Sequence, residues 1–415
     1  MRLDADILHR LLPPYSRLWR AVLSAIVALA LVVGDYLLDN YPYPVLDDVD
    51  SLAFIELMSE RVAHQTDDSV LYLNVAYDKQ LVPVFDDFGD TMGSAVITDR
   101  AVLRHLLEVA ENADYRFLVL DVRFDDGMYT DSDSALWTVM ARLPRFAYSA
   151  HSADGNAADS STLHAASISD YGATLSTGFT RWQYLQPAGE SLPLTIYRSI
   201  DGGDIRRHGC FYTDRGRLCR NTLFIPLPSD VLLPERADGQ VRYPLLGSQV
   251  MRWNSDDELA GMMRDRIVVV GDFDGDTHDT YIGSVPGPVL ISCAYDQLRQ
   301  GAHLLNWWFV SFIFIVYGLI CYRVLSASPL WERFGWVRRH PALGTLLSFF
   351  GWEFLLTLLS IAMYLIMAES FITFLPAVTF TALGWLNSDL LKNNTGMGKK
   401  KTKTKVQYIC HSLNL

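Results

Sequence analysis

The chain has 415 residues, 50% of them hydrophobic, and a formal net charge of −12. Residues 1–20 and 304–415 together contain 14 Lys and Arg and six Asp and Glu, which leaves 21 of the 35 bases and 41 of the 47 acids between them. This strongly acidic middle repels nucleic acid, so nucleic-acid binding is excluded. The hydrophobic content is enough for one sizeable domain together with membrane segments.

Four apolar runs are long enough to cross a bilayer core of about 30 Å. The first, 20–38, follows an arginine-rich start. Ala28-Leu29-Ala30 resembles a signal cleavage site, but the apolar run continues past it, so we expect an uncleaved anchor. The other three runs lie later in the chain, at 306–325, 343–367 and 371–391.

The basic residues predict the orientation of these segments. The loop 326–342 is rich in arginine and the tail 392–415 is rich in lysine. Under the positive-inside rule both lie in the cytoplasm, as does the segment 1–19, and residues 39–305 lie outside. We therefore expect a multi-pass protein of a bacterial inner membrane, with four transmembrane helices and one periplasmic or extracellular domain. The lysine-rich tail can also contact anionic membrane lipid.

Hydrophobic periodicity predicts that helices and strands alternate within the outside domain. In chain order we expect a helix at 47–65, a strand at 69–76, a polar loop at 82–92, a helix at 98–110, a strand at 115–122, a helix at 134–143, a strand at 146–150, a surface loop at 155–169, a helix at 193–200, a hairpin at 209–225, a helix at 247–263, a buried strand at 267–270 and a helix at 289–298. The alternation predicts an α/β fold with a mostly parallel sheet flanked by helices, plus a β-hairpin.

Acidic side chains follow three of the predicted strands, and ligands of open α/β sheets bind at the carboxyl ends of strands. The functional interpretation is a small-ligand site, with these candidates: Asp78, Asp121, Arg123, Asp272, Asp274, Asp276, His278 and Asp279. In the alternative interpretation, the acids cap helices or pair with Arg100, Arg123 or Arg266. Crowded carboxylates can also recruit a cation, but the spacing lacks the Gly and Glu of a calcium-binding EF-hand. We expect neither a metal nor a cofactor.

Two further pairs of residues are candidates for specific bonds. Cys210 and Cys219 lie on opposite arms of the predicted hairpin, where a disulfide is one option and two buried thiols the other. Glu353 is the acid well inside a predicted span, and an intramembrane carboxylate is a functional candidate by default. We expect a hydrogen bond from Glu353 to Asn387 or Ser388 on the antiparallel last span. The sequence contains no nucleophile elbow and no phosphate-binding glycine loop, so we expect no enzyme activity.

The order of these residues resembles the type-two CHASE domain, an extracellular sensory domain of bacteria. The resemblance covers about 40–303 and rests on 98–103 with 117–124, and on 265–272 with His278-Asp279 and Pro286-Gly287-Pro288. Members of this family typically have three membrane spans directly after the sensor, as expected here. The resemblance implies detection of a small ligand or stimulus. Many members continue into a kinase or cyclase, but only about 24 residues follow Leu391, too few for a catalytic domain.

The first hypothesis is therefore a membrane-anchored sensor that binds a small ligand outside and signals through a separate cytoplasmic or membrane protein. A non-sensing envelope scaffold or assembly factor is the alternative, and a metal-dependent hydrolase that uses the carboxylates is the second alternative. The oligomeric state is open, with a homodimer as one option.

Overall fold

The computed structural model describes two compact units, an α/β unit between residues 49 and 305 and a helical unit from 17–39 and 306–387. The residues described are 17–40, 69–85, 88, 90–124, 130–150, 166–169, 172–174, 178–227, 254–326 and 341–387. The predicted helix at 47–65 and most of the predicted loop at 155–169 lie outside them.

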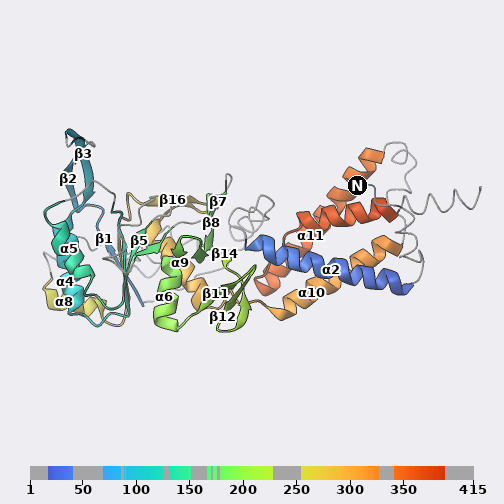
Figure 1. The fold of residues 1–415 in the computed structure, drawn as a ribbon, viewed down its shortest axis with the longest axis horizontal. Coiled ribbons are helices and arrows are strands. Elements are labelled where there is room, and N and C mark those ends of the chain that lie inside the picture. Colours follow the sequence, from blue (N-terminus) through green and yellow to red (C-terminus); the bar gives the residue numbers. More distant parts are fainter. Residues whose placement is uncertain are drawn as a thin grey trace, which may run out of the picture. The chain divides into compact units, whose positions relative to one another are not determined.

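A five-stranded parallel sheet forms the centre of the α/β unit (Figure 1). Its order is β1 (Val70–Asn74), β15 (Ile267–Gly271), β4 (Phe117–Asp121), β5 (Phe146–Ala150) and β6 (Ala166–Ile168). The apolar run of β15 is buried at every position, as its β-branched composition predicts for a strand covered on both faces. The predicted parallel sheet is thus confirmed, and β1, β15, β4 and β5 lie where the periodicity placed them. The prediction is wrong for β6, which lies within the stretch 155–169 that was expected to be a surface loop.

Helices cover both faces of this sheet. The helices α4 (Arg100–Glu111), α5 (Asp133–Met140) and α8 (Asp256–Met263) form one core with alternate strand residues. The other strand residues form a second core with α6 (Leu192–Asp201) and α9 (Gly287–Arg299). The start of α4 follows from Asp99, whose carboxylate accepts hydrogen bonds from the backbone N–H groups of Ala101 and Val102.

Smaller sheets account for most of the differences from the predicted elements. The first contains β7 (Gly172–Thr174), β8 (Gly178–Gln183), β14 (Thr222–Phe224), β16 (Thr277–Thr280) and β17 (Gly283–Pro286). The second pairs β9 (Leu185–Gln186) with β10 (Gly189–Glu190). The third contains β11 (Ile205–His208), β12 (Phe211–Asp214) and β13 (Arg217–Cys219). The acidic stretch that follows β15 therefore ends in β16, where no strand was predicted. Only β12 and β13 form the predicted hairpin.

The predicted loop at 82–92 is wrong, because most of it belongs to two paired strands. These are β2 (Lys79–Phe85) and β3 (Thr91–Thr98), which pair antiparallel and form a separate two-stranded sheet, here called the ribbon. Pro83 and Gly93 within the strands disfavour regular sheet and concealed them in the sequence.

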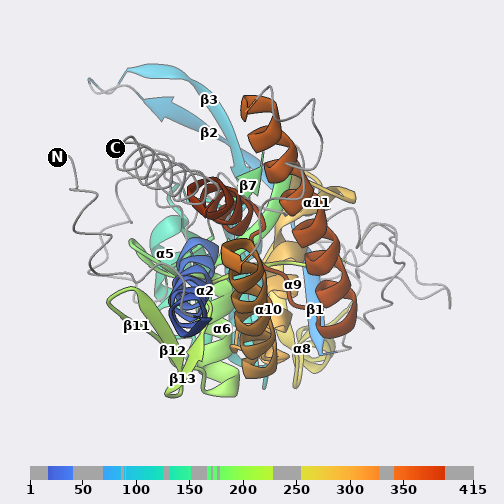
Figure 2. The same cartoon turned by 90° about the vertical axis from the view of Figure 1, so that its right-hand side faces the viewer.

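The helical unit contains three helices that are long and apolar enough to cross a membrane, α2 (Arg17–Asp39), α10 (Trp307–Ser326) and α11 (Pro341–Met367). Such helices indicate a membrane protein. Helices α2 and α10 lie side by side (Figure 2). The fourth predicted span is a shorter apolar helix, Phe374–Asn387.

A non-helical segment, 368–373, joins α11 to this short helix and folds back along α11. Phe371 forms hydrogen bonds of 3.3 Å through both its N–H and its carbonyl with the Ser360 hydroxyl. The Thr373 hydroxyl donates to Glu353, at 2.6 Å. From Glu353 to the end of α11 the helix rises about 21 Å, and six extended residues span about 20 Å, so the segment returns to the level of Glu353.

Buried polar groups hold this returning segment. The backbone N–H of Ile372 donates to the Asp35 carboxylate of α2 at 2.7 Å, and Asp35 is 7% exposed. The predicted bond between Glu353 and Asn387 is wrong, because Glu353 accepts from Thr373 and the Asn387 amide donates to the Val324 carbonyl at 2.9 Å. The alternative partner, Ser388, lies outside the described residues. The prediction assumed that the last helix begins directly after the turn at the end of α11.

We predict that Thr373→Val lowers the thermal stability of the helical unit. The change removes the donor to Glu353 and leaves a buried carboxylate oxygen without it, which costs about 1–3 kcal/mol. The measurement is thermal unfolding of the purified full chain in detergent. The control is Thr379→Val, whose hydroxyl donates within its own helix to Leu375 and is expected to matter little. Equal midpoints for the two variants would contradict the role of Thr373.

Candidate functional site

The chain leaves neighbouring strands of the main sheet toward opposite faces. After β1 and β4 it runs to α4 and α5 on one face, whereas after β15 it runs through β16 and β17 to α9 on the other. Since β15 lies between β1 and β4, both flanks of its carboxyl end are points where the topology switches. Ligands of open α/β sheets bind at such points. Asn74, Gly271 and Asp121 lie in register there, at the end of the three strands.

Asp272, directly after β15, forms an ion pair with Lys79 at the start of the ribbon. The Lys79 Nζ lies 2.5 Å from Oδ2, while Oδ1 accepts hydrogen bonds from the N–H groups of Asp274 and Gly275. Burial favours a raised pKa of Asp272, but the hydrogen bond from Lys79 and those from the backbone outweigh it, and the pKa is lowered. Asp272 is therefore a carboxylate with a cation already beside it.

Asp274 lies between an amide and a phenol. The Asn74 Nδ2 donates to its Oδ2 at 3.4 Å, and the hydrogen bond with Asp274 raises the pKa of Tyr77. The Asn74 Oδ1 accepts from the N–H of Ala76 and of Phe273, which ties the ends of β1 and β15 together. Sequence analysis missed Asn74 and Tyr77. The signal that was available is their place at the end of a predicted strand, beside Asp78.

The remaining strand-end aspartates are buried at the same edge. Asp78 and Asp121 are each 7% exposed. Asp121 lies opposite Gly271 in the sheet. A Cβ added to Gly271 would lie 3.2 Å from the backbone carbonyl oxygen of Asp121 and 2.5 Å from the ring of Pro288. The strand ends and the start of α9 thus approach more closely than any side chain on Gly271 would allow.

The other candidates lie on neighbouring elements and not in this cluster. Asp276 and His278 form a pair with 3.1 Å between Oδ1 and Nε2, next to the first residue of α9. Asp279 is exposed on β16, with its carbonyl packed against the glycine that begins β8, and Arg123 is exposed after β4. Within the described residues no three His, Cys, Asp or Glu side chains converge as metal ligands would.

One of the arginines of the alternative interpretation, Arg100, is 2% exposed, and its Nε lies 3.4 Å from Asp133 on α5. The carboxylate at the edge is instead neutralised by Lys79. The position of Lys79 directly after Asp78, at the end of a predicted strand, could have indicated a base at this edge.

The candidate disulfide between Cys210 and Cys219 is not formed, and both residues remain thiols. Cys219 pairs across the hairpin with Tyr212, whereas Cys210 is exposed in the turn before β12. Burial, followed by the negative charge of Asp214, raises the pKa of Cys219 to about 12. The hairpin was predicted correctly, but its register places the two thiols on different partners.

A second polar cluster, not predicted from the sequence, is buried under α6. The Asp214 Oδ2 lies 3.0 Å from both the Tyr197 hydroxyl and the His303 Nε2, and its Oδ1 accepts from the N–H of Asp204 at 2.7 Å. Burial favours a raised pKa of Asp214, but these donors outweigh it and lower the pKa. His303 is fully buried, and its Nδ1 has no hydrogen-bond partner among the described residues.

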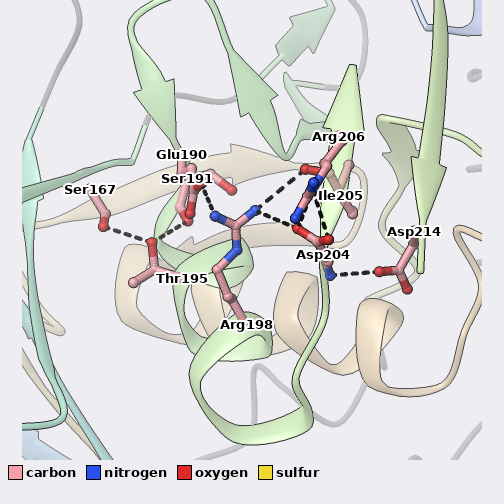
Figure 3. Close-up of polar contacts among 9 residues, drawn as sticks. All are labelled: Ser167, Glu190, Ser191, Thr195, Arg198, Asp204, Ile205, Arg206 and Asp214. Atoms are coloured by element: carbon pink, nitrogen blue, oxygen red, sulfur yellow. Dashed lines mark hydrogen bonds and ion pairs between the residues drawn. The ribbon is translucent and has the colours of Figure 1, made fainter. Parts of the chain in front are cut away.

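This cluster continues into a network around Arg198 (Figure 3). The guanidinium contacts Glu190, the Ile205 carbonyl at 3.4 Å and Asp204 at 3.8 Å. Asp204 in turn joins Arg206 to Asp214. These residues lie within 190–214 but belong to different elements and follow no recognisable motif, so their spacing did not indicate the network. The network connects α6 to β10 and β11 and thereby stabilises the packing of α6 on the small sheets.

We predict that the α/β unit loses stability as the pH falls from 7 to 5. Burial, opposed by Asp214, lowers the pKa of His303, so the unfolded chain binds the proton more readily. The stabilising contribution of neutral His303 is complete above the unfolded value of about 6.5 and is lost as the pH falls toward the lowered folded value. The contribution of Asp214 is lost only near and below its ordinary value of 3.8, outside this window.

The measurement is the thermal midpoint of the full chain between pH 7 and pH 5. His303→Gln keeps a donor for Asp214 and removes the titration, so its midpoint should change less with pH. The exposed His208→Gln should behave like the unchanged chain. An unaltered pH dependence in His303→Gln would show that other groups cause it.

Comparisons with models of protein families, with curated proteins and with solved structures find no match for this chain. What the edge of the sheet can do therefore follows from its own geometry and charge. It presents one lysine among several carboxylates, at the place where α/β sheets bind small ligands.

Proposed function

We propose that this chain is a membrane-anchored sensor whose α/β unit binds a small polar ligand at the carboxyl end of β15. The observation on which the proposal rests is the ion pair of Lys79 with Asp272 at the switch point, with Asp274 beside it. This pair joins the ribbon to the sheet, so a ligand that separates the two side chains also changes how the ribbon is held. Such a ligand shifts the population between two states of the unit, provided that its affinity for them differs.

The charge of the edge favours a ligand with a cationic group. Asp78, Asp121, Asp272 and Asp274 lie at or beside the strand ends, and Lys79 is in contact with Asp272. Carboxylates gathered in one crevice raise the local concentration of cations. An ammonium group can take the place of Lys79 at Asp272, and an anionic group on the same ligand can bind the released lysine.

The arrangement in the membrane also belongs to this proposal. The Asn387 amide bonds to the carbonyl of Val324, so the last helix and α10 end together. This supports four membrane crossings with the arginine-rich loop and the lysine-rich tail on one side, the cytoplasm, and the α/β unit on the other. The resemblance to type-two CHASE sensors agrees with that layout. Signalling then requires a separate partner protein in the cytoplasm or membrane.

The two alternatives differ in their support. A scaffold or assembly factor is favoured by the exposed apolar ribbon, which fits protein docking better than ligand binding. It predicts a constitutive partner that crosslinks with or without ligand. A metal-dependent hydrolase gains no support, since the described residues contain no group of three ligands.

We predict that a small ammonium compound stabilises the full chain through Asp272. The probes are lysine, putrescine, acetate, Mg²⁺ and Ca²⁺, added to the purified chain in detergent. At a concentration 100 times its dissociation constant, a ligand adds about 2.7 kcal/mol, which raises the thermal midpoint by about 5–10 °C. Asp272→Asn should abolish the shift for the probe that binds.

The matched control is Asp279→Asn, which removes the same charge from an exposed position on β16. It should leave the shift unchanged. The absence of a shift with every probe, or an equal shift in Asp272→Asn, would count against ligand binding at this edge.

A further inference from the structure

The ribbon extends from the rest of the α/β unit, past α5 (Figures 1 and 2). Its two strands pair along their whole length, with Leu81 opposite Val96 and Pro83 opposite Ser94. In the described part of the chain, β2 and β3 pair only with each other. A two-stranded sheet by itself is marginally stable, so a ribbon of this length gains from a further strand or a cover.

The two faces of the ribbon differ in exposure. Val82 and Ile97, on the inner face near its base, are 4% and 8% exposed. On the outer face Leu81 and Val96 are 72% and 64% exposed, and Met92 is 72% exposed. Single exposed apolar residues are ordinary, but a row along one projecting element is typical of an interaction surface.

The edges of the ribbon differ as well. Strand β2 contains Lys79 and Pro83, and charge and proline are the usual protection of an edge strand. Strand β3 has the sequence TMGSAVIT, with neither a charge nor a proline in eight residues. An unprotected edge of this kind pairs readily with an extended segment of another chain.

Charge decides between the possible occupants of this edge. Asp90 is exposed directly before β3, and residues 21–303 contain 41 acids against 21 bases. A second copy of the chain would bring these acids, and two acidic domains, against each other. An anionic lipid surface is repelled in the same way. A segment that contains Lys or Arg is attracted.

We propose that the edge of β3 binds an extended, basic segment of a partner protein, which adds a third strand to the ribbon. Backbone hydrogen bonds to β3 supply the pairing, apolar side chains of the segment continue the row of Leu81 and Val96, and its basic side chains are attracted by the net negative charge of the α/β unit. The site is distinct from the ligand-binding edge at Asp272, and it does not require the chain to be a sensor.

The test uses a labelled nine-residue peptide of alternating Val and Lys and the full chain in detergent, with binding followed by fluorescence anisotropy. The first reference peptide has proline in place of alternate valines, which keeps the charge but prevents strand pairing. The second has Glu in place of Lys. We expect both references to bind at least about tenfold more weakly, the effect of losing one or two backbone hydrogen bonds or of reversing the charge.

Variants of the chain locate the binding. Ser94 is exposed in the middle of β3, so Ser94→Pro and Ser94→Lys should each weaken binding of the Val–Lys peptide. Ala101→Lys adds the same single charge at an exposed position of α4 and should leave binding unchanged. The two Ser94 variants act by different means, so a folding defect in one does not decide the result.

Three outcomes would overturn the proposal. Equal binding of the proline-containing peptide would show attraction by charge alone. Equal binding of the Val–Lys peptide to Ser94→Lys and to the unchanged chain would place the site elsewhere. A dimer of the full chain that is lost in Ser94→Lys would show that a second copy occupies the edge. Retained ligand-induced stabilisation in the Ser94 variants would separate this result from the sensor function.

Discussion

The burial of β15 on both faces is the constraint from which the candidate site follows. A strand whose every side chain is buried needs helices on both sides of the sheet, and the chain supplies them by leaving β15 toward α9 while β1 and β4 lead to α4 and α5. The topology therefore switches on both flanks of the carboxyl end of β15. The backbone there turns at once, and Asp272 stabilises the turn by accepting hydrogen bonds from the N–H groups of Asp274 and Gly275.

The helical unit obeys a related constraint, that buried polar groups need partners. A non-helical backbone at depth exposes N–H and carbonyl groups that lipid cannot satisfy. Asp35 from α2 accepts from the backbone N–H of Ile372, and Ser360 from α11 bonds both backbone groups of Phe371, whereas Glu353 accepts from the side-chain hydroxyl of Thr373. Asp35 and Glu353 are thus explained by their hydrogen bonds to the returning segment. An ion path is not needed to account for them.

Features that depend on local sequence were predictable. The apolar run of β15, the strands β4 and β5 and the Asp99 cap of α4 follow from periodicity and from hydrogen bonding within a few residues. Three long apolar helices follow from composition alone. The position of the three strand-end aspartates was predictable because parallel strands place their carboxyl ends at one edge of the sheet.

Features that depend on distant contacts were not predictable. The ribbon was interpreted as a loop because Pro83 and Gly93 interrupt its pattern, although pairing between β2 and β3 tolerates both. The cysteine pair failed because the turn before β12, not the hairpin alone, decides the register. Glu353 was assigned the wrong partner because nothing local signals that 368–373 runs backwards along α11. Each error concerns which residues meet, not which elements form.

The short helix Phe374–Asn387 has a consequence for how the protein reaches its membrane. Its 14 residues rise about 21 Å, which is less than the thickness of a hydrocarbon core, about 30 Å. The stretch before it, 368–373, is not helical, so its backbone groups are not paired within a helix. Such a segment is a poor substrate for insertion by itself. Its placement therefore depends on α2 and α11, whose Asp35 and Ser360 bind the stretch directly before it.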